Sequence, residues 1–150
     1  MVTNENVIGR LKSILDSNKD KRIVVVGTTC AGKTTFLQLI DGCFDMDKLV
    51  FPKLTKDEAD YVCQTPWTPE IGNMMSKLTR ERVAVERGKP VFGTVVLDCD
   101  LIVYLKISDG LLKERANFRV VNFDDAKNMQ KQIEQEISGA HIPVIEFFVG

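Results

Sequence analysis

The fold is decided by the stretch Arg22-Ile23-Val24-Val25-Val26-Gly27-Thr28-Thr29-Cys30-Ala31-Gly32-Lys33-Thr34-Thr35-Phe36. The apolar run that comes first is typical of a strand buried on both faces of a parallel sheet. Two glycines follow, and glycine adopts backbone angles that a Cβ would forbid. A Lys-Thr pair and apolar residues at helical spacing come next. The stretch therefore predicts a buried strand, a tight glycine loop and a helix.

This strand–loop–helix setting matches a phosphate-binding P-loop. The amides of such a loop cradle phosphate oxygens, and the N terminus of the helix adds free donors and a positive dipole end. Lys33 is expected to reach the β- and γ-phosphates of a nucleotide, and the Thr34 hydroxyl to hold Mg²⁺. The candidate nucleotide-binding residues are Gly27, Thr28, Thr29, Cys30, Ala31, Gly32, Lys33, Thr34 and Thr35. A glycine-rich turn that binds nothing is the alternative.

The composition is that of one globular domain spanning residues 1–150. Apolar residues make up 44% of the chain and charged residues 27%, which excludes a disordered class. The 20 basic and 21 acidic residues nearly cancel, so we expect no general nucleic-acid surface. The polar N terminus does not resemble a signal peptide, and no apolar run reaches the length of a membrane span. We expect a cytoplasmic protein with no membrane partner, for which a homodimer is one compatible state.

The cysteines are widely spaced, and the chain has a single histidine, His141. They are Cys30, Cys43, Cys63 and Cys99. No Cys-x-x-Cys pair occurs, so a zinc site is not expected, and isolated thiols suit a reducing compartment.

Helical and strand patterns alternate along the chain without repeats, which predicts a three-layer α/β domain. Strands are expected over residues 22–26, 48–51, 90–97, 101–107 and 142–148. Helices are expected over residues 5–17, 33–42, 69–88, 109–119 and 124–138, with a short one opening at a capping box on Thr55. Thr68 and Ser108 are the expected caps of the helices that follow them.

The relation between the third and fourth strands stays open at this point. Only a short loop separates residues 90–97 from residues 101–107, whereas parallel neighbours need a crossover of about a dozen residues. Either the first of these strands is shorter, near residues 91–94, or the pair is antiparallel.

The helix after residues 100–107 carries Arg115 and Arg119 four positions apart, on one face. By composition alone it could be an ordinary solvated helix. A strand of this kind followed by spaced arginines resembles the nucleoside and nucleotide kinases of the P-loop superfamily, a group that includes adenylate-, thymidylate- and shikimate-kinase-like proteins. The resemblance implies a mostly parallel five-stranded sheet of order 2-3-1-4-5, with ATP as donor and Mg²⁺ as cofactor. It also implies that Arg115 and Arg119 are catalytic lid arginines that close over the phosphates.

Three acids are further candidates. Asp45 and Asp47 resemble the Asp-x-Asp of shikimate-type kinases, in which one carboxylate assists the metal and the other holds the acceptor hydroxyl. Asp98 follows an apolar run, as a second metal-coordinating acid does. A polar turn at Asp45 and Asp47, and a plain loop residue at Asp98, are the alternatives.

Trp67 lies between two prolines and is the only tryptophan. It could stack on the ring of a phosphoryl acceptor, or it could anchor the following helix to the core. The third strand, near residues 90–94, lacks the acid that often ends it in the kinases.

The functional hypothesis is an ATP-dependent phosphotransferase acting on a nucleoside, nucleotide or other small molecule. A regulatory, nucleotide-switched protein is a second hypothesis, but the guanine-specifying Asn-Lys-x-Asp is missing. Asn18-Lys19-Asp20 precedes the loop and lacks that spacing. Nucleotide binding without turnover is a third.

Overall fold

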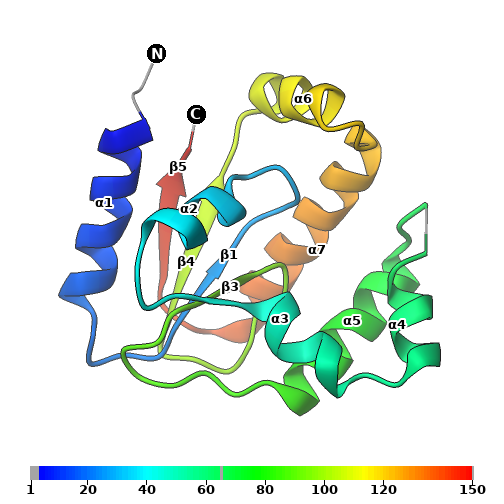
Figure 1. The fold of residues 1–150 in the computed structure, drawn as a ribbon, viewed down its shortest axis with the longest axis horizontal. Helices are drawn as coiled ribbons and strands as arrows, with labels where there is room; N and C mark the ends of the chain where they lie inside the picture. The colour runs from blue at the N-terminus through cyan, green and yellow to red at the C-terminus, as the bar shows by residue number, and fades with distance from the viewer. Residues whose placement is uncertain (1–3, 65, 150) are drawn as a thin grey trace.

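The computed structural model describes residues 4–64 and 66–149, which form a five-stranded parallel sheet (Figure 1). The strand order is β2-β3-β1-β4-β5. The strands are β1 (Ile23–Val26), β2 (Phe44–Asp45), β3 (Val91–Gly93), β4 (Leu101–Lys106) and β5 (Val144–Phe148). All neighbouring strands run parallel, so the expected order 2-3-1-4-5 is confirmed and is consistent with a P-loop NTPase-like fold.

Helices flank the sheet. They are α1 (Asn4–Ser17), α2 (Lys33–Leu39), α3 (Met46–Val50), α4 (Lys56–Val62), α5 (Pro69–Arg82), α6 (Asp109–Phe118) and α7 (Phe123–Ala140), with a 3₁₀ turn η1 (Phe51–Lys53) after α3. The caps expected from the sequence are confirmed: Thr55, Thr68 and Ser108 each accept from an amide of the first turn. Because a cap satisfies an otherwise orphaned donor, these boundaries are set locally.

The central strand divides the core into two layers. Ile23 and Val25 join the cluster under α1 and α2, whereas Val24 and Val26 join the cluster that contains α3 and α7. All four side chains are essentially inaccessible to solvent. The expectation of a strand buried on both faces is therefore confirmed, and the domain has three layers.

The second strand was expected in the wrong place. Residues 48–51 are helical, and β2 is instead Phe44–Asp45, immediately before α3. Asp45 accepts a hydrogen bond from the amide of Asp47 and so caps α3. Met46 and Val50 are buried against the sheet at helical spacing. The apolar run near Val50 is the inner face of a short helix, which a window of four residues does not separate from a strand.

The third and fourth strands are not neighbours, because β1 lies between them. Val24 pairs with Val91 on one side and with Ile102 on the other, and both pairings are parallel. The sequence allowed this arrangement with a shortened strand, and β3 indeed ends at Gly93. Residues 94–100 then return to the start of β4 without a helix, with Val95, Val96 and Leu97 buried in the core.

Two other boundaries differ from expectation. Helix α5 ends at Arg82 rather than at Gly88, because Val83 turns to an extended conformation and packs into the core beside Val85. Helix α2 ends at Leu39, before Gly42. Gly42 and Gly88 do have positive φ angles, but each lies a few residues beyond the end of its helix and so does not cap it. None of the described helices combines the length and the apolar character that crossing a bilayer requires.

The close approach of α3 to the sheet gives a stability prediction. A Cβ on Gly93 would lie 2.6 Å from the Cβ and the sulfur of Met46, which is itself buried. Gly93→Ala should therefore lower the free energy of unfolding by about 1–3 kcal/mol, as overpacking does. Gly9→Ala is the matched control, because nothing lies within 4 Å of that Cβ on exposed α1. Alanine should stabilise α1 there by about 0.5–1 kcal/mol. Urea titrations measure both, and equal effects would contradict the packing argument.

Candidate functional site

The glycine loop leaves the carboxyl end of β1 and is held on two sides. The amide of Gly27 donates to the carbonyl of Gly93 at the end of β3, at 3.2 Å. The buried hydroxyl of Thr28 donates to the carbonyl of Ala126 on α7, at 2.5 Å. The loop is therefore tied both to the neighbouring strand and to a helix almost one hundred residues away in sequence.

The loop presents amide donors that the protein leaves without acceptors. Among the described residues, the amides of Thr28, Thr29, Cys30 and Gly32 donate to no protein acceptor. Gly32 has a φ of 99°, a left-handed conformation that favours glycine, and it caps α2. Because buried amides are almost always paired, these donors suit an anionic ligand rather than a solvated turn.

Lys33, the first residue of α2, folds back over the loop. Its Nζ donates to the carbonyl oxygens of Gly27 at 2.5 Å and of Thr28 at 2.7 Å. Desolvation lowers the pKa of Lys33 to about 8, although the charges of Asp47, Cys30 and Asp45 oppose this shift. The ammonium is thus held in a place where its charge costs free energy, which an incoming anion would offset.

The two acids of the Asp-x-Asp pattern lie at the carboxyl edge of the sheet, as Lys33 does. Asp45 ends β2, level with Phe92 of β3, and its carboxylate caps α3 through the amide of Asp47. Desolvation and the charge of Asp45 raise the pKa of Asp47, whereas Lys33 lowers it. A carboxylate pair therefore faces the lysine, with the proton affinity of one member increased by the other.

Arg115 of α6 and Arg119, the residue after this helix, lie on the groove beside the loop. Arg115 Nη1 donates to the carbonyl oxygen of Cys30 at 3.0 Å, and it lies 3.6 Å from where a Cβ on Gly32 would be. Arg119 is exposed, and its charge acts against protonation of Lys33. Arg115 thus contacts the loop directly, and Arg119 lines the same groove; their catalytic role stays a prediction.

A groove of about 760 Å³ opens between the loop, α6 and the N-terminal half of α1. It is lined by Val7, Ile8, Cys30, Ala31, Gly32, Thr34, Thr35, Phe36, Leu111, Glu114, Arg115, Phe118, Arg119 and Val149. The contributions of α1, Phe118 and Val149 were not foreseen from sequence. Their apolar residues read as core positions, and only the tertiary arrangement places them beside the loop.

Asp98 does not belong to this site. Its carboxylate pairs with Arg22 at 3.0 Å, and the same guanidinium pairs with Asp100 at 3.1 Å. Arg22 and Asp100 precede β1 and β4, so this cluster lies at the amino edge of a parallel sheet whose carboxyl edge carries the loop. The structure therefore does not bring together Asp98 and Thr34, the two residues predicted to hold a metal, because the length of the strands separates them.

Trp67 lies near the N-terminal end of α7 and packs on α5. A Cβ on Gly72 of α5 would lie 2.3 Å from the Trp67 ring. The backbone amide of Trp67 donates to the carboxylate of Asp125 at 3.4 Å. Trp67 does not line the groove beside the loop. This packing favours the anchoring interpretation over stacking on an acceptor.

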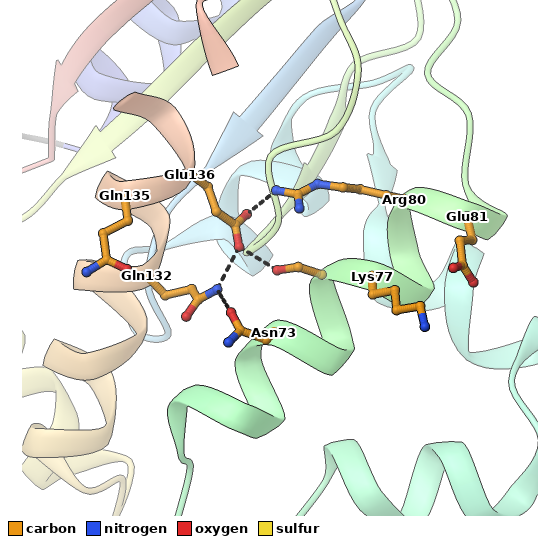
Figure 2. A pocket seen from close by; sticks show the side chains of 8 residues that line it. Asn73, Lys77, Arg80, Glu81, Gln132, Gln135 and Glu136 are labelled. Atoms are coloured by element: carbon orange, nitrogen blue, oxygen red, sulfur yellow. Dashed lines mark hydrogen bonds and ion pairs between the residues drawn. The ribbon is translucent and has the colours of Figure 1, made fainter. Parts of the chain in front are cut away.

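A second hollow, of about 450 Å³, lies between α5 and α7 (Figure 2). Its centre is Glu136, which accepts from Arg80 at 2.9 Å, from Ser76 at 2.5 Å and from Gln132 at 2.9 Å. Glu136 also accepts from the amide of Val96, in the segment after β3. Because these groups already satisfy one another, the network fastens α5, α7 and that segment together.

The Asn18-Lys19-Asp20 segment is also distant from the loop. Asn18 lies in the turn between α1 and β1, and its side-chain amide donates to the carbonyl of Ile14 in α1. This turn precedes β1 and therefore lies at the amino edge, where it has no access to a base held near the loop.

Comparisons with known proteins add no assignment. No protein-family model matches the chain, and a search of curated proteins finds no similar sequence. Within residues 4–64 and 66–149, no group of three or more His, Cys, Asp and Glu side chains could hold a metal ion by itself. The cysteines that were expected to be isolated are free thiols.

The coupling between Lys33 and Asp47 can be tested without any ligand. Asp47→Asn removes a negative charge that favours the ammonium, so it should lower the pKa of Lys33 further below about 8. Asp98→Asn is the matched control, because that carboxylate lies at the far edge of the sheet and should leave the titration in place. The pH dependence of the Lys33 side-chain NMR shifts reports both. Similar titrations in the two variants would contradict the proximity of Asp47 to Lys33.

Proposed function

We propose that this chain is a P-loop phosphotransferase that moves the γ-phosphoryl group of ATP to a small-molecule, nucleoside or nucleotide acceptor. The observation that carries the proposal is the convergence on one loop of free amides, a desolvated lysine, two carboxylates and two arginines. Phosphoryl transfer depends mainly on positioning and charge neutralisation, and these are the groups it needs.

The triphosphate fits the loop because the loop amides are hydrogen-bond donors that have no acceptor within the described protein. The amides from Thr28 to Gly32 would take the phosphate oxygens, and Lys33 would exchange its two carbonyl partners for the β- and γ-phosphates. Because the triphosphate favours the charged ammonium, binding would restore the pKa that burial has lowered.

Mg²⁺ fits the same place through oxygen donors. Thr34 is exposed at the start of α2, and the carboxylates of Asp45 and Asp47 are near enough to Lys33 for their charges to affect its pKa. Mg²⁺ is usually held by one or two carboxylates or hydroxyls together with the phosphates themselves. When bound, the ion supplies charge neutralisation at the β- and γ-oxygens.

The acceptor side is assigned to Asp45 and Asp47. A carboxylate of raised pKa is better suited to accept a hydroxyl proton than one of ordinary pKa. On the other flank, Arg115 and Arg119 would leave the loop carbonyl and solvent to contact the transferring phosphoryl group. Arginine suits this role because its planar fork matches phosphate oxygens.

Nucleotide binding without transfer is the second candidate, and one observation favours it. Strand β3, which lies next to β1, ends at Gly93, and the following residue is Thr94. No carboxylate therefore stands at the end of this strand. Binding of MgATP without ADP release for any acceptor would select this candidate.

Lys33→Ala tests the central claim. The variant should lose turnover to background while keeping the fold, because Lys33 belongs to no hydrophobic cluster. The assay is coupled ADP release over a panel of nucleosides, nucleoside monophosphates and small hydroxylated metabolites. Circular dichroism on the same samples checks the fold. Retained turnover, or a wild-type melting curve unmoved by millimolar MgATP and MgGTP, would refute the proposal.

Arg115→Lys separates a catalytic arginine from a solvated one. The variant should lower kcat by about tenfold or more with little change in KM, because lysine cannot copy the bidentate contact made in the transition state. Arg119→Lys should act in the same direction. Lys113→Arg on the exposed side of α6 is the matched control and should leave kcat unchanged. A KM effect without a kcat effect in the two arginine variants would contradict this role.

A further inference from the structure

We propose that the groove between α1 and α6 holds the nucleoside part of the triphosphate through apolar and stacking contacts, with Phe118 as the stacking surface. The inference rests on the proposed function, since the phosphates must lie in the loop. It assigns the ligand contacts of residues far from the motif and predicts weak selection among bases.

The groove continues directly from the phosphate loop. Cys30, Ala31 and Gly32 of the loop line it, as do Thr34 and Thr35 of α2. Its volume of about 760 Å³ lies within the usual range of small-ligand pockets, roughly 300–1,000 Å³. A ligand anchored by its phosphates on the loop amides therefore has room for its nucleoside along this groove, whose lining includes loop residues.

Much of the groove lining is apolar. Val7 and Ile8 come from α1, Val149 follows β5, and Leu111 and Phe118 come from α6. Helix α1 is held in place there by the core: Leu11 is fully buried, and the Arg10 guanidinium lies 5.1 Å from the ring centroid of Phe147. The apolar wall is thus carried by a fixed helix rather than by a free loop.

Phe118 is the most unusual lining residue, because its side chain is 89% exposed. The buried face of α6 is formed by Leu112 and Ala116, so Phe118 is not needed for packing the helix. Val120, two residues later, is also unusual. It is 93% exposed and has a φ of 55°, a left-handed conformation that is costly for a β-branched residue. An aromatic face held beside an anion-binding loop is the arrangement that stacks a base.

The groove offers few groups that could distinguish one base from another. The polar and charged side chains among its described lining residues are few. They are Thr34, Thr35, Glu114, Arg115 and Arg119, and the proposed function already gives Thr34 and the two arginines contacts with Mg²⁺ or the phosphates. Glu114 is the one carboxylate in the lining. Stacking is tolerant of base identity because every base has a π-face. We therefore expect ATP and GTP to bind within about tenfold of each other, since strong selection needs a built set of hydrogen bonds.

Calorimetry with three probes tests the inference: MgATP, MgGTP and magnesium tripolyphosphate, which lacks a nucleoside. Phe118→Ala should weaken ATP and GTP by about tenfold and leave tripolyphosphate unchanged, because stacking on an aromatic ring is lost. Phe118→Trp should retain or strengthen nucleotide binding. Ile8→Ala, on the opposite wall, should also weaken ATP but not tripolyphosphate.

Phe148→Ala is the matched control, because Phe148 is also an exposed phenylalanine, at 62%, and does not line the groove. It should bind all three probes as the wild type does. Unchanged ATP binding in Phe118→Ala and Ile8→Ala, with wild-type tripolyphosphate binding, would overturn this inference alone. ATP and GTP affinities differing by more than about a hundredfold would overturn the stacking account. A wild type that binds none of the probes would overturn the proposed function, and this inference with it.

Discussion

The candidate site depends on one interaction, the pair of hydrogen bonds from the Lys33 ammonium to the carbonyls of Gly27 and Thr28. A desolvated cation needs acceptors, and here the loop supplies them from its own backbone. Those carbonyls turn toward the lysine while amides of the same loop are left without protein partners. Burial in this loop lowers the pKa of Lys33 by desolvation, the two carbonyl acceptors partly compensate the ammonium, and the unpaired amides give the loop its anion-binding character.

The topology explains why so many charged groups meet at this loop. Strand β1 is central, with β3 on one side and β4 on the other; the chain after β1 leads to β2 on one side, and the chain after β4 leads to β5 on the other. In open α/β sheets a ligand crevice forms at the carboxyl ends of the strands where the order reverses. Here Asp45 and Asp47 approach from the β2 side, and Arg115 approaches after β4. Lys33 lies between them.

The first helix has an unexpected part in this arrangement. Figure 1 shows α1 standing alongside β5, so elements from the two ends of the chain lie side by side. Val7 and Leu11 share a core cluster with Phe147, and α2 contributes Phe36 to the same cluster. One continuous apolar layer therefore supports the loop helix and forms the wall of the groove.

The sequence by itself determined the elements whose signals are local. The apolar run before Gly27, the glycine loop and the caps at Thr55, Thr68 and Ser108 follow from backbone geometry and from hydrogen bonds within a few residues. For that reason these were found where the pattern predicted. The alternation of helices and strands, with the resemblance to P-loop kinases, was also enough to anticipate the sheet order.

Only the tertiary structure decided which end of the sheet each side chain occupies and which distant segments meet. Asp45 and Asp98 were both candidate acids of the site, yet one ends β2 at the carboxyl edge and the other pairs with Arg22 at the amino edge. The apolar residues before Asp98 are a buried connection that leads back to the start of β4, and their composition does not distinguish such a connection from a strand that ends at the carboxyl edge. Likewise, the sequence near Phe118 does not reveal its place in the groove, because the groove also takes residues from α1 and the glycine loop, far away in the chain. Such placements depend on packing across the whole sheet, which no local pattern contains.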